Sequence, residues 1–88
     1  MPKIVITHAV KDIETWLQGK AERVAAFSPF ASNITDHVAI DGSKNVAITA
    51  DVHDMDAAQA SMTSPSPEMA AAMEKHGVIQ PITAHIEK

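Results

Sequence analysis

The chain has 88 residues, 45% of them apolar and 20% charged, which is enough for one domain over residues 1–88 but not for two cores. It has no cysteine, which excludes disulfide bonds and a thiolate zinc site, and its formal net charge of -4 without a basic run argues against nucleic acid as a partner. No apolar run approaches the roughly 20 residues that span a membrane, and the first ten residues do not resemble a signal peptide. We therefore expect a cytoplasmic protein without a membrane partner.

The first half of the chain predicts a strand, a helix and a β-hairpin. Residues 3–10 are rich in β-branched side chains, which is typical of a strand. Asp12 then suits the N-cap of a helix whose apolar stripe ends near Phe27. Two more strands are expected at 34–40 and 46–52, because the intervening DGSKN is a compact hairpin loop.

The second half predicts helical segments and a last strand. Asp54 suits an N-cap, and the TSPSP stretch interrupts the helix that follows it. Helical structure is expected to resume with Ser66 as N-cap and Pro67 at the first helical position. Gly77 provides the left-handed residue that ends the helix, and residues 82–86 form the final strand.

This order, β-α-β-β-α-β, predicts an α+β fold of the ferredoxin-like type, in which two helices cover one face of a four-stranded antiparallel sheet. Strand alternation divides the side chains between the two faces of the sheet. One face is almost wholly aliphatic and is expected beneath the helices: Ile4, Ile6, His8, Val38, Ile40, Val46, Ile48, Ala50, Val52, Ile82, Ala84 and Ile86.

The other face is small, polar and rich in histidine, and it carries His37, Asp51, His53 and His85. We interpret it as the interface of a homodimer, because a small domain gains core by pairing. An ordinary solvent-exposed sheet face is the alternative. Hairpin pairing is expected to set His37 near Thr49 and diagonal to Asp51, in a hydrogen-bond network rather than a metal site.

Two stretches resemble a known group of proteins. VKDIETW (10–16) is similar to a V-x-D-x-x-x-W pattern after the first strand, and SPEMAAAMEKHGV (66–78) to an S-P-E-[LM]-x-x-A-M-x-x-x-G-V pattern before the last. Both patterns are typical of dimeric α/β-barrel proteins, which include antibiotic-biosynthesis monooxygenases and small polyketide cyclases. The resemblance implies a homodimer whose sheets form a barrel, and a small-molecule pocket in the cleft between sheet and helices.

His8 is the leading candidate for a catalytic base, since an imidazole on an aliphatic face would be buried and neutral. The alternative is a core histidine that is hydrogen-bonded to the backbone. His76 and Asn45 are expected to position substrate oxygens at the same rim. Their alternative roles are a favourable charge at a helix end and an ordinary turn residue, respectively.

Three apolar side chains, Trp16, Met69 and Met73, are candidates for binding the substrate, with plain core packing as the alternative. The chain lacks a glycine-rich phosphate loop and a Rossmann fingerprint, so no cofactor is expected. The first hypothesis is a cofactor-free monooxygenase- or cyclase-like enzyme that acts on an apolar or aromatic molecule. The alternatives are a non-catalytic homodimeric module that binds a small ligand, and a haem-binding protein that uses His76.

Overall fold

The structure is a computed structural model, and it describes residues 2–63 and 67–88. Four strands and four helices follow one another along the chain. They are β1 (Lys3–Val10), α1 (Ile13–Gln18), α2 (Lys20–Phe27), β2 (Ala31–Val38), β3 (Asn45–Val52), α3 (Met55–Thr63), α4 (Pro67–Lys75) and β4 (Val78–Ile86).

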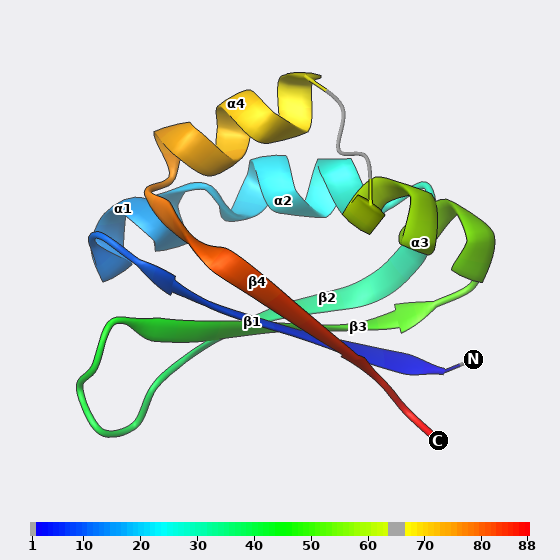
Figure 1. The fold of residues 1–88 in the computed structure, drawn as a ribbon, viewed down its shortest axis with the longest axis horizontal. Coiled ribbons are helices and arrows are strands. Elements are labelled where there is room, and N and C mark those ends of the chain that lie inside the picture. The colour runs from blue at the N-terminus through cyan, green and yellow to red at the C-terminus, as the bar shows by residue number, and fades with distance from the viewer. Residues whose placement is uncertain (1, 64–66) are drawn as a thin grey trace.

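The strands form one antiparallel sheet in the order β2-β3-β1-β4. All the helices lie on the same side of it (Figure 1). This is the ferredoxin-like topology that the order of elements predicts. None of the helices in the described ranges is long and apolar enough to cross a membrane.

The caps form as expected where the structure describes them. The carboxylate of Asp12 accepts from the Thr15 amide at 2.9 Å and from its hydroxyl at 2.7 Å. The Asp54 carboxylate accepts from the Ala57 amide at 3.1 Å. Gly77 has φ 75, the left-handed conformation that ends α4. The expected cap at Ser66 lies outside the described residues.

The first helix is divided, although the apolar stripe predicts a continuous one. Gly19 both ends α1 and begins α2, and its amide donates to the Trp16 carbonyl at 3.0 Å. The imidazole of His76, which follows α4, lies directly against this glycine: a Cβ atom built at residue 19 would be 2.4–2.6 Å from three ring atoms. Only glycine therefore fits here without a shift of the ring.

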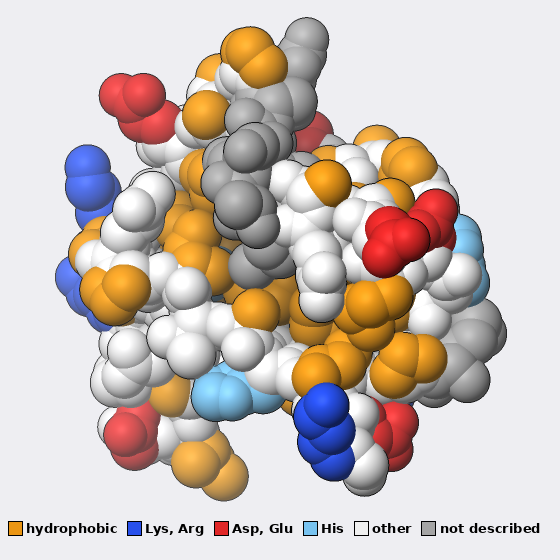
Figure 2. All heavy atoms as spheres, turned by 45° about the vertical axis from the view of Figure 1, so that its right-hand side comes forward, with side chains coloured by type: hydrophobic (Ala, Val, Ile, Leu, Met, Phe, Trp, Pro, Cys, Tyr) orange, Lys and Arg blue, Asp and Glu red, His pale blue; other side chains and the backbone are white. Residues whose placement is uncertain are grey.

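The core lies between the helices and the aliphatic face of β1 and β3, where alternate side chains are buried as predicted. The buried apolar residues are Ile4, Ile6, Val10, Trp16, Phe30, Ala31, Val46, Ile48, Ala50, Val52 and Ala58. The edge strand β4 is covered less completely, because Ile82 and Ile86 are half-buried and Ala84 is exposed. Figure 2 shows apolar side chains reaching the surface on this side of the molecule.

The prediction for the second strand is wrong in its boundaries. β2 spans Ala31–Val38 and ends before Ile40, which is fully exposed in the hairpin loop instead of lying under the helices. The loop closes around Gly42, whose φ is 81 and whose amide donates to the Ala39 carbonyl at 3.4 Å. The apolar side chain of Ile40 continues the alternating pattern and so predicts one more strand residue. The turn-forming residues that follow end the strand earlier.

Candidate active site

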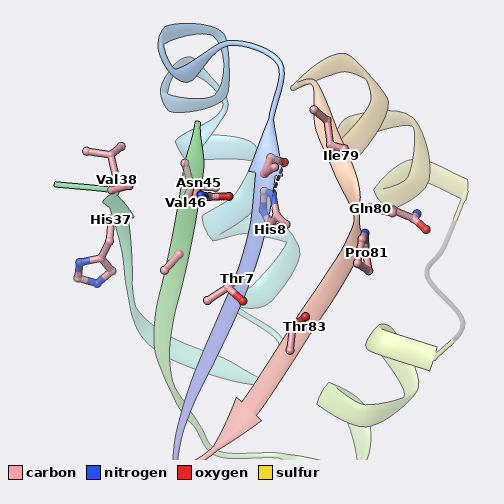
Figure 3. Close-up of a pocket in the computed structure, with 13 residues that line it drawn as sticks. Thr7, His8, His37, Val38, Asn45, Val46, Ile79, Gln80, Pro81 and Thr83 are labelled. Atoms are coloured by element: carbon pink, nitrogen blue, oxygen red, sulfur yellow. Dashed lines mark hydrogen bonds between the residues drawn. The ribbon is translucent and has the colours of Figure 1, made fainter. Parts of the chain in front are cut away.

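A hollow of about 530 Å³ lies on the sheet face that points away from the helices. Residues of all four strands line it (Figure 3), together with the adjacent chain at the end of β2. The lining residues are Thr7, His8, Ala9, His37, Val38, Ala39, Asn45, Val46, Ala47, Ile79, Gln80, Pro81 and Thr83. A volume of this size accommodates an ordinary small-molecule ligand.

The resemblance placed the pocket elsewhere, in the cleft between sheet and helices. The cavity in that cleft, lined only by apolar residues of the sheet, α2, α3 and the chain after α2, is about 10 Å³, barely the volume of one water molecule. Side chains of the core fill the rest of the space. The larger hollow on the opposite face is therefore the better candidate for a site.

A pairing irregularity in β4 borders this hollow. Thr7 pairs with Thr83 and Ala9 pairs with Ile79, so three residues of β4 lie opposite the single residue His8. Such bulges locally interrupt the ladder and are common beside active sites. Gln80 and Pro81, which belong to the bulge, form part of the rim (Figure 3).

His8 lies opposite this bulge. Its side chain points to the helix side, it is 8% exposed, and its Nδ1 is 3.0 Å from the Ala9 carbonyl oxygen. Because a carbonyl only accepts, Nδ1 carries the proton in the neutral ring, and Nε2 keeps a lone pair. Burial lowers the pKa of His8; the Ala9 carbonyl opposes this, and the Arg23 charge adds to it. The ring is therefore held neutral at neutral pH, with Nε2 as the basic atom.

Asn45 and His37 border the same hollow. The Asn45 amide nitrogen donates to the Ser43 hydroxyl at 3.1 Å, which joins the end of the hairpin loop to the first residue of β3. His37 Nε2 lies 2.9 Å from the Thr49 hydroxyl oxygen, as the hairpin pairing predicts. The hollow thus brings two of the three expected catalytic residues, His8 and Asn45, to one place, and it adds His37.

A buried polar cluster behind His8 was missed in the sequence. The Trp16 ring contacts the His8 ring edge-on, with centroids 5.9 Å apart, and the Arg23 guanidinium lies 4.1 Å from the Trp16 ring centroid. Arg23 also forms a bidentate ion pair with Asp36, Nη2 to Oδ2 at 2.7 Å and Nε to Oδ1 at 3.4 Å. Arg23 is on the inner side of α2, and Asp36 faces the helices from β2. A charged residue at a core-facing position of each element was therefore the feature of the sequence that could have predicted this ion pair.

His76 lies away from the hollow. Its ring is 5% exposed and packs on Gly19, and its Nε2 is 3.4 Å from the Glu22 carboxylate. Trp16 contacts His8 but does not line the hollow, and neither does Met73, which is half-buried on α4. The side chain of Met69 lies outside the described part of the chain. The hollow therefore does not bring His76 or Met73 together with His8.

The remaining polar residues of the open sheet face are dispersed. Asp51 accepts from Asn33 at 2.8 Å and pairs with Lys3 at 3.4 Å, so its partners are not histidines. His53 lies beyond the end of β3, and His85 is exposed on β4. Among the described residues, no three histidines or carboxylates group as metal ligands would.

Comparisons with known proteins bear on the fold. No family model and no curated protein matches the sequence. Solved structures do match over nearly the full length. One is an antibiotic biosynthesis monooxygenase, at TM-score 0.69 and 14% identity over 100% of this chain and 97% of that one. Another is a variant of SnoaB, a cofactor-independent oxygenase from Streptomyces nogalater, at TM-score 0.68 and 14% identity over 99% and 90%.

A third match is a dimeric ferredoxin-like protein from an uncultured marine organism, at TM-score 0.62 and 3% identity over 100% of this chain and 93% of that one. These likenesses confirm the ferredoxin-like fold and the fold resemblance expected from the two sequence stretches. At such low identities, they establish the shape of the chain and leave its chemistry to be argued from its own residues.

Proposed function

We propose that the chain is a cofactor-free enzyme of the monooxygenase or cyclase type, which binds an aromatic small molecule in the hollow and uses His8 as its base. One observation carries the proposal: His8, whose neutral imidazole keeps a basic Nε2, is a lining residue of the hollow of about 530 Å³ and lies opposite the β4 bulge. The likeness to a cofactor-independent oxygenase supports it at the level of fold.

The chemistry requires a substrate with an acidic C–H or O–H group. His8 Nε2 would take the proton and leave a carbanion, enolate or phenolate, and Asn45 and His37 at the rim would orient the substrate oxygens. For an anthrone, molecular oxygen then accepts the electrons. The ring CH₂ becomes C=O, one oxygen atom enters the product and the other leaves as water.

A second copy of the chain would complete the site. We propose that the open sheet faces of two copies pack together in an isologous dimer, so that each face covers the hollow of the other. The face carries small side chains such as Thr7, Ala9 and Ala47, which permit close approach of two sheets. His37, Asp51, His53 and His85 remain the predicted residues of this interface.

Oxygen uptake with 1,8-dihydroxyanthrone as the probe tests the enzymatic proposal, after subtraction of its spontaneous oxidation. We expect a rate above background for the wild type, and a loss of about 10²-fold or more in His8→Ala, the usual contribution of a general base. Lys20→Met, which changes an exposed side chain on α2 away from the open sheet face, is the control and should retain the rate. A wild type no faster than background, or an unimpaired His8→Ala protein, would overturn the proposal.

A non-catalytic ligand-binding dimer is the second candidate. It is favoured by the internal hydrogen bonds of Asn45 and His37, which engage groups that a catalytic site would offer to substrate. Saturable binding of the same anthrone without oxygen uptake would favour this reading. Haem ligation by His76 has no comparable support, because that ring is buried against Gly19.

A further inference from the structure

Two hydrogen-bond donors are buried without a partner directly behind His8. They are the indole Nε1 of Trp16, a residue with 0% exposure, and the guanidinium Nη1 of Arg23, a residue with 8% exposure. Neither atom has an acceptor within the described residues. Buried N–H groups are nearly always paired, and an unpaired one is unfavourable, so two of them side by side call for an explanation.

The cluster fixes the direction in which Arg23 can bind a further group. Nε and Nη2 of Arg23 donate to the Asp36 carboxylate, and the guanidinium lies over the Trp16 ring. These two contacts fix the position of the Arg23 side chain. Nη1 is left without an acceptor among the described residues, and the guanidinium that carries it lies over the indole ring. The closeness of guanidinium and indole allows one carboxylate or enolate group to accept from both.

The charges fit an anion that forms at this place. Arg23 and Asp36 together are neutral before a ligand binds. When His8 takes a proton from a substrate, it becomes a cation, and the substrate becomes an anion beside it. A second cation with a free N–H, supported by an indole donor, stabilises negative charge that develops on a substrate oxygen.

We propose that Trp16 Nε1 and Arg23 Nη1 hold an anionic oxygen of the ligand, a carboxylate or an enolate, which enters beside His8 when β4 parts from β1 at the bulge. The inference rests on the proposed function for the role of His8. It adds two positioning groups and a substrate class: aromatic molecules with an oxygen that is, or becomes, negatively charged.

The test uses benzoate as the probe and neutral benzamide, which has a similar shape, as its control. Trp16 is the sole tryptophan, so the ¹⁵N-labelled protein has a single indole N–H resonance. We expect benzoate to move this resonance downfield in a saturable titration and benzamide to leave it in place. No change in the chemical shift of this resonance with benzoate, or equal changes with both compounds, would overturn the inference.

Variants separate the anion site from general binding. The double substitution Arg23→Met with Asp36→Leu removes both charges together and should weaken benzoate binding about tenfold or more, as expected for loss of a charge-assisted hydrogen bond. Lys20→Met removes an exposed cation from the same helix and should leave the affinity unchanged. Unaltered benzoate affinity in the double variant contradicts the proposal.

If the double variant does not fold, Trp16→Phe keeps an aromatic ring and removes Nε1, and calorimetry should then show a selective loss for benzoate. These readouts need no turnover. A protein that binds benzoate at the indole but does not oxidise the anthrone keeps this inference and loses the enzymatic proposal. The reverse result keeps the role of His8 and removes the anion site.

Discussion

Substitution of Gly19 by alanine tests the contact that divides the first helix. Alanine normally stabilises a helical position relative to glycine by about 1 kcal/mol, and Gly19 has φ -85, which alanine adopts without strain. The structure predicts the opposite outcome, because the new methyl group would lie 2.4–2.6 Å from the ring atoms of His76. Overpacking of a buried contact costs about 1–3 kcal/mol.

An overpacking cost of about 2 kcal/mol set against a helical gain of about 1 kcal/mol leaves an expected loss of about 1 kcal/mol in the free energy of unfolding by urea, or a fall of about 4–8 °C in the melting temperature for a domain of this size. The decisive step is a double-mutant cycle with His76→Ala. Once the imidazole is removed, Gly19→Ala should become neutral or stabilising by up to about 1 kcal/mol, which gives a coupling near 2 kcal/mol.

Gly42→Ala provides the control, because residue 42 has φ 81 and no atom within 4 Å of a built Cβ. Its loss, caused by backbone conformation alone, should be the same with and without His76. The reasoning is refuted if Gly19→Ala equals or exceeds the wild type in stability, or if its effect is identical in the two His76 backgrounds.

Three further predictions concern stability. Arg23→Met alone leaves Asp36 as a buried unpaired carboxylate and should lower the free energy of unfolding by urea by about 3–5 kcal/mol. Adding Asp36→Leu should restore most of this loss. Equal losses in the single and double variants would contradict the prediction. The pKa of His8 is lowered from 6.5 in the folded protein, so the unfolded chain binds more protons and the unfolding free energy should fall as pH decreases below about 6.5. Urea unfolding at several pH values should show that His8→Gln makes this dependence on pH less steep. An unchanged dependence in the variant would count against the argument. Asp12→Ala removes the cap of α1 and should cost about 1 kcal/mol by thermal unfolding, while Asp56→Ala, on an exposed position in the first turn of α3, should cost less.

The dimer proposal and the hollow depend on each other physically. The hollow is open to solvent in the single chain, and an aromatic ligand in it would leave one side in water. A partner sheet would cover that side and exclude water from the proton transfer at His8. Concentration-dependent oligomerisation of the wild type, weakened by Ala47→Glu at the floor of the hollow, is the corresponding observation.

The sequence by itself determined the local features of this protein. Period-two alternation placed Ile4, Ile6 and His8 on the buried face of β1, and the caps at Asp12 and Asp54 began helices where their chemistry requires it. These signals depend on neighbours within a few residues, so they can be read along the chain. The element order then restricted the topology to the ferredoxin-like sheet.

Only the tertiary structure decided which of those residues meet. Gly19 and His76 are far apart in the chain and become one contact, and Arg23 finds Asp36 across the helix–sheet interface. The bulge in β4 that borders the hollow opposite His8 arises from a pairing register, which no local pattern specifies. Such contacts depend on how whole elements pack, and packing is a property of three-dimensional shape rather than of spacing along the chain.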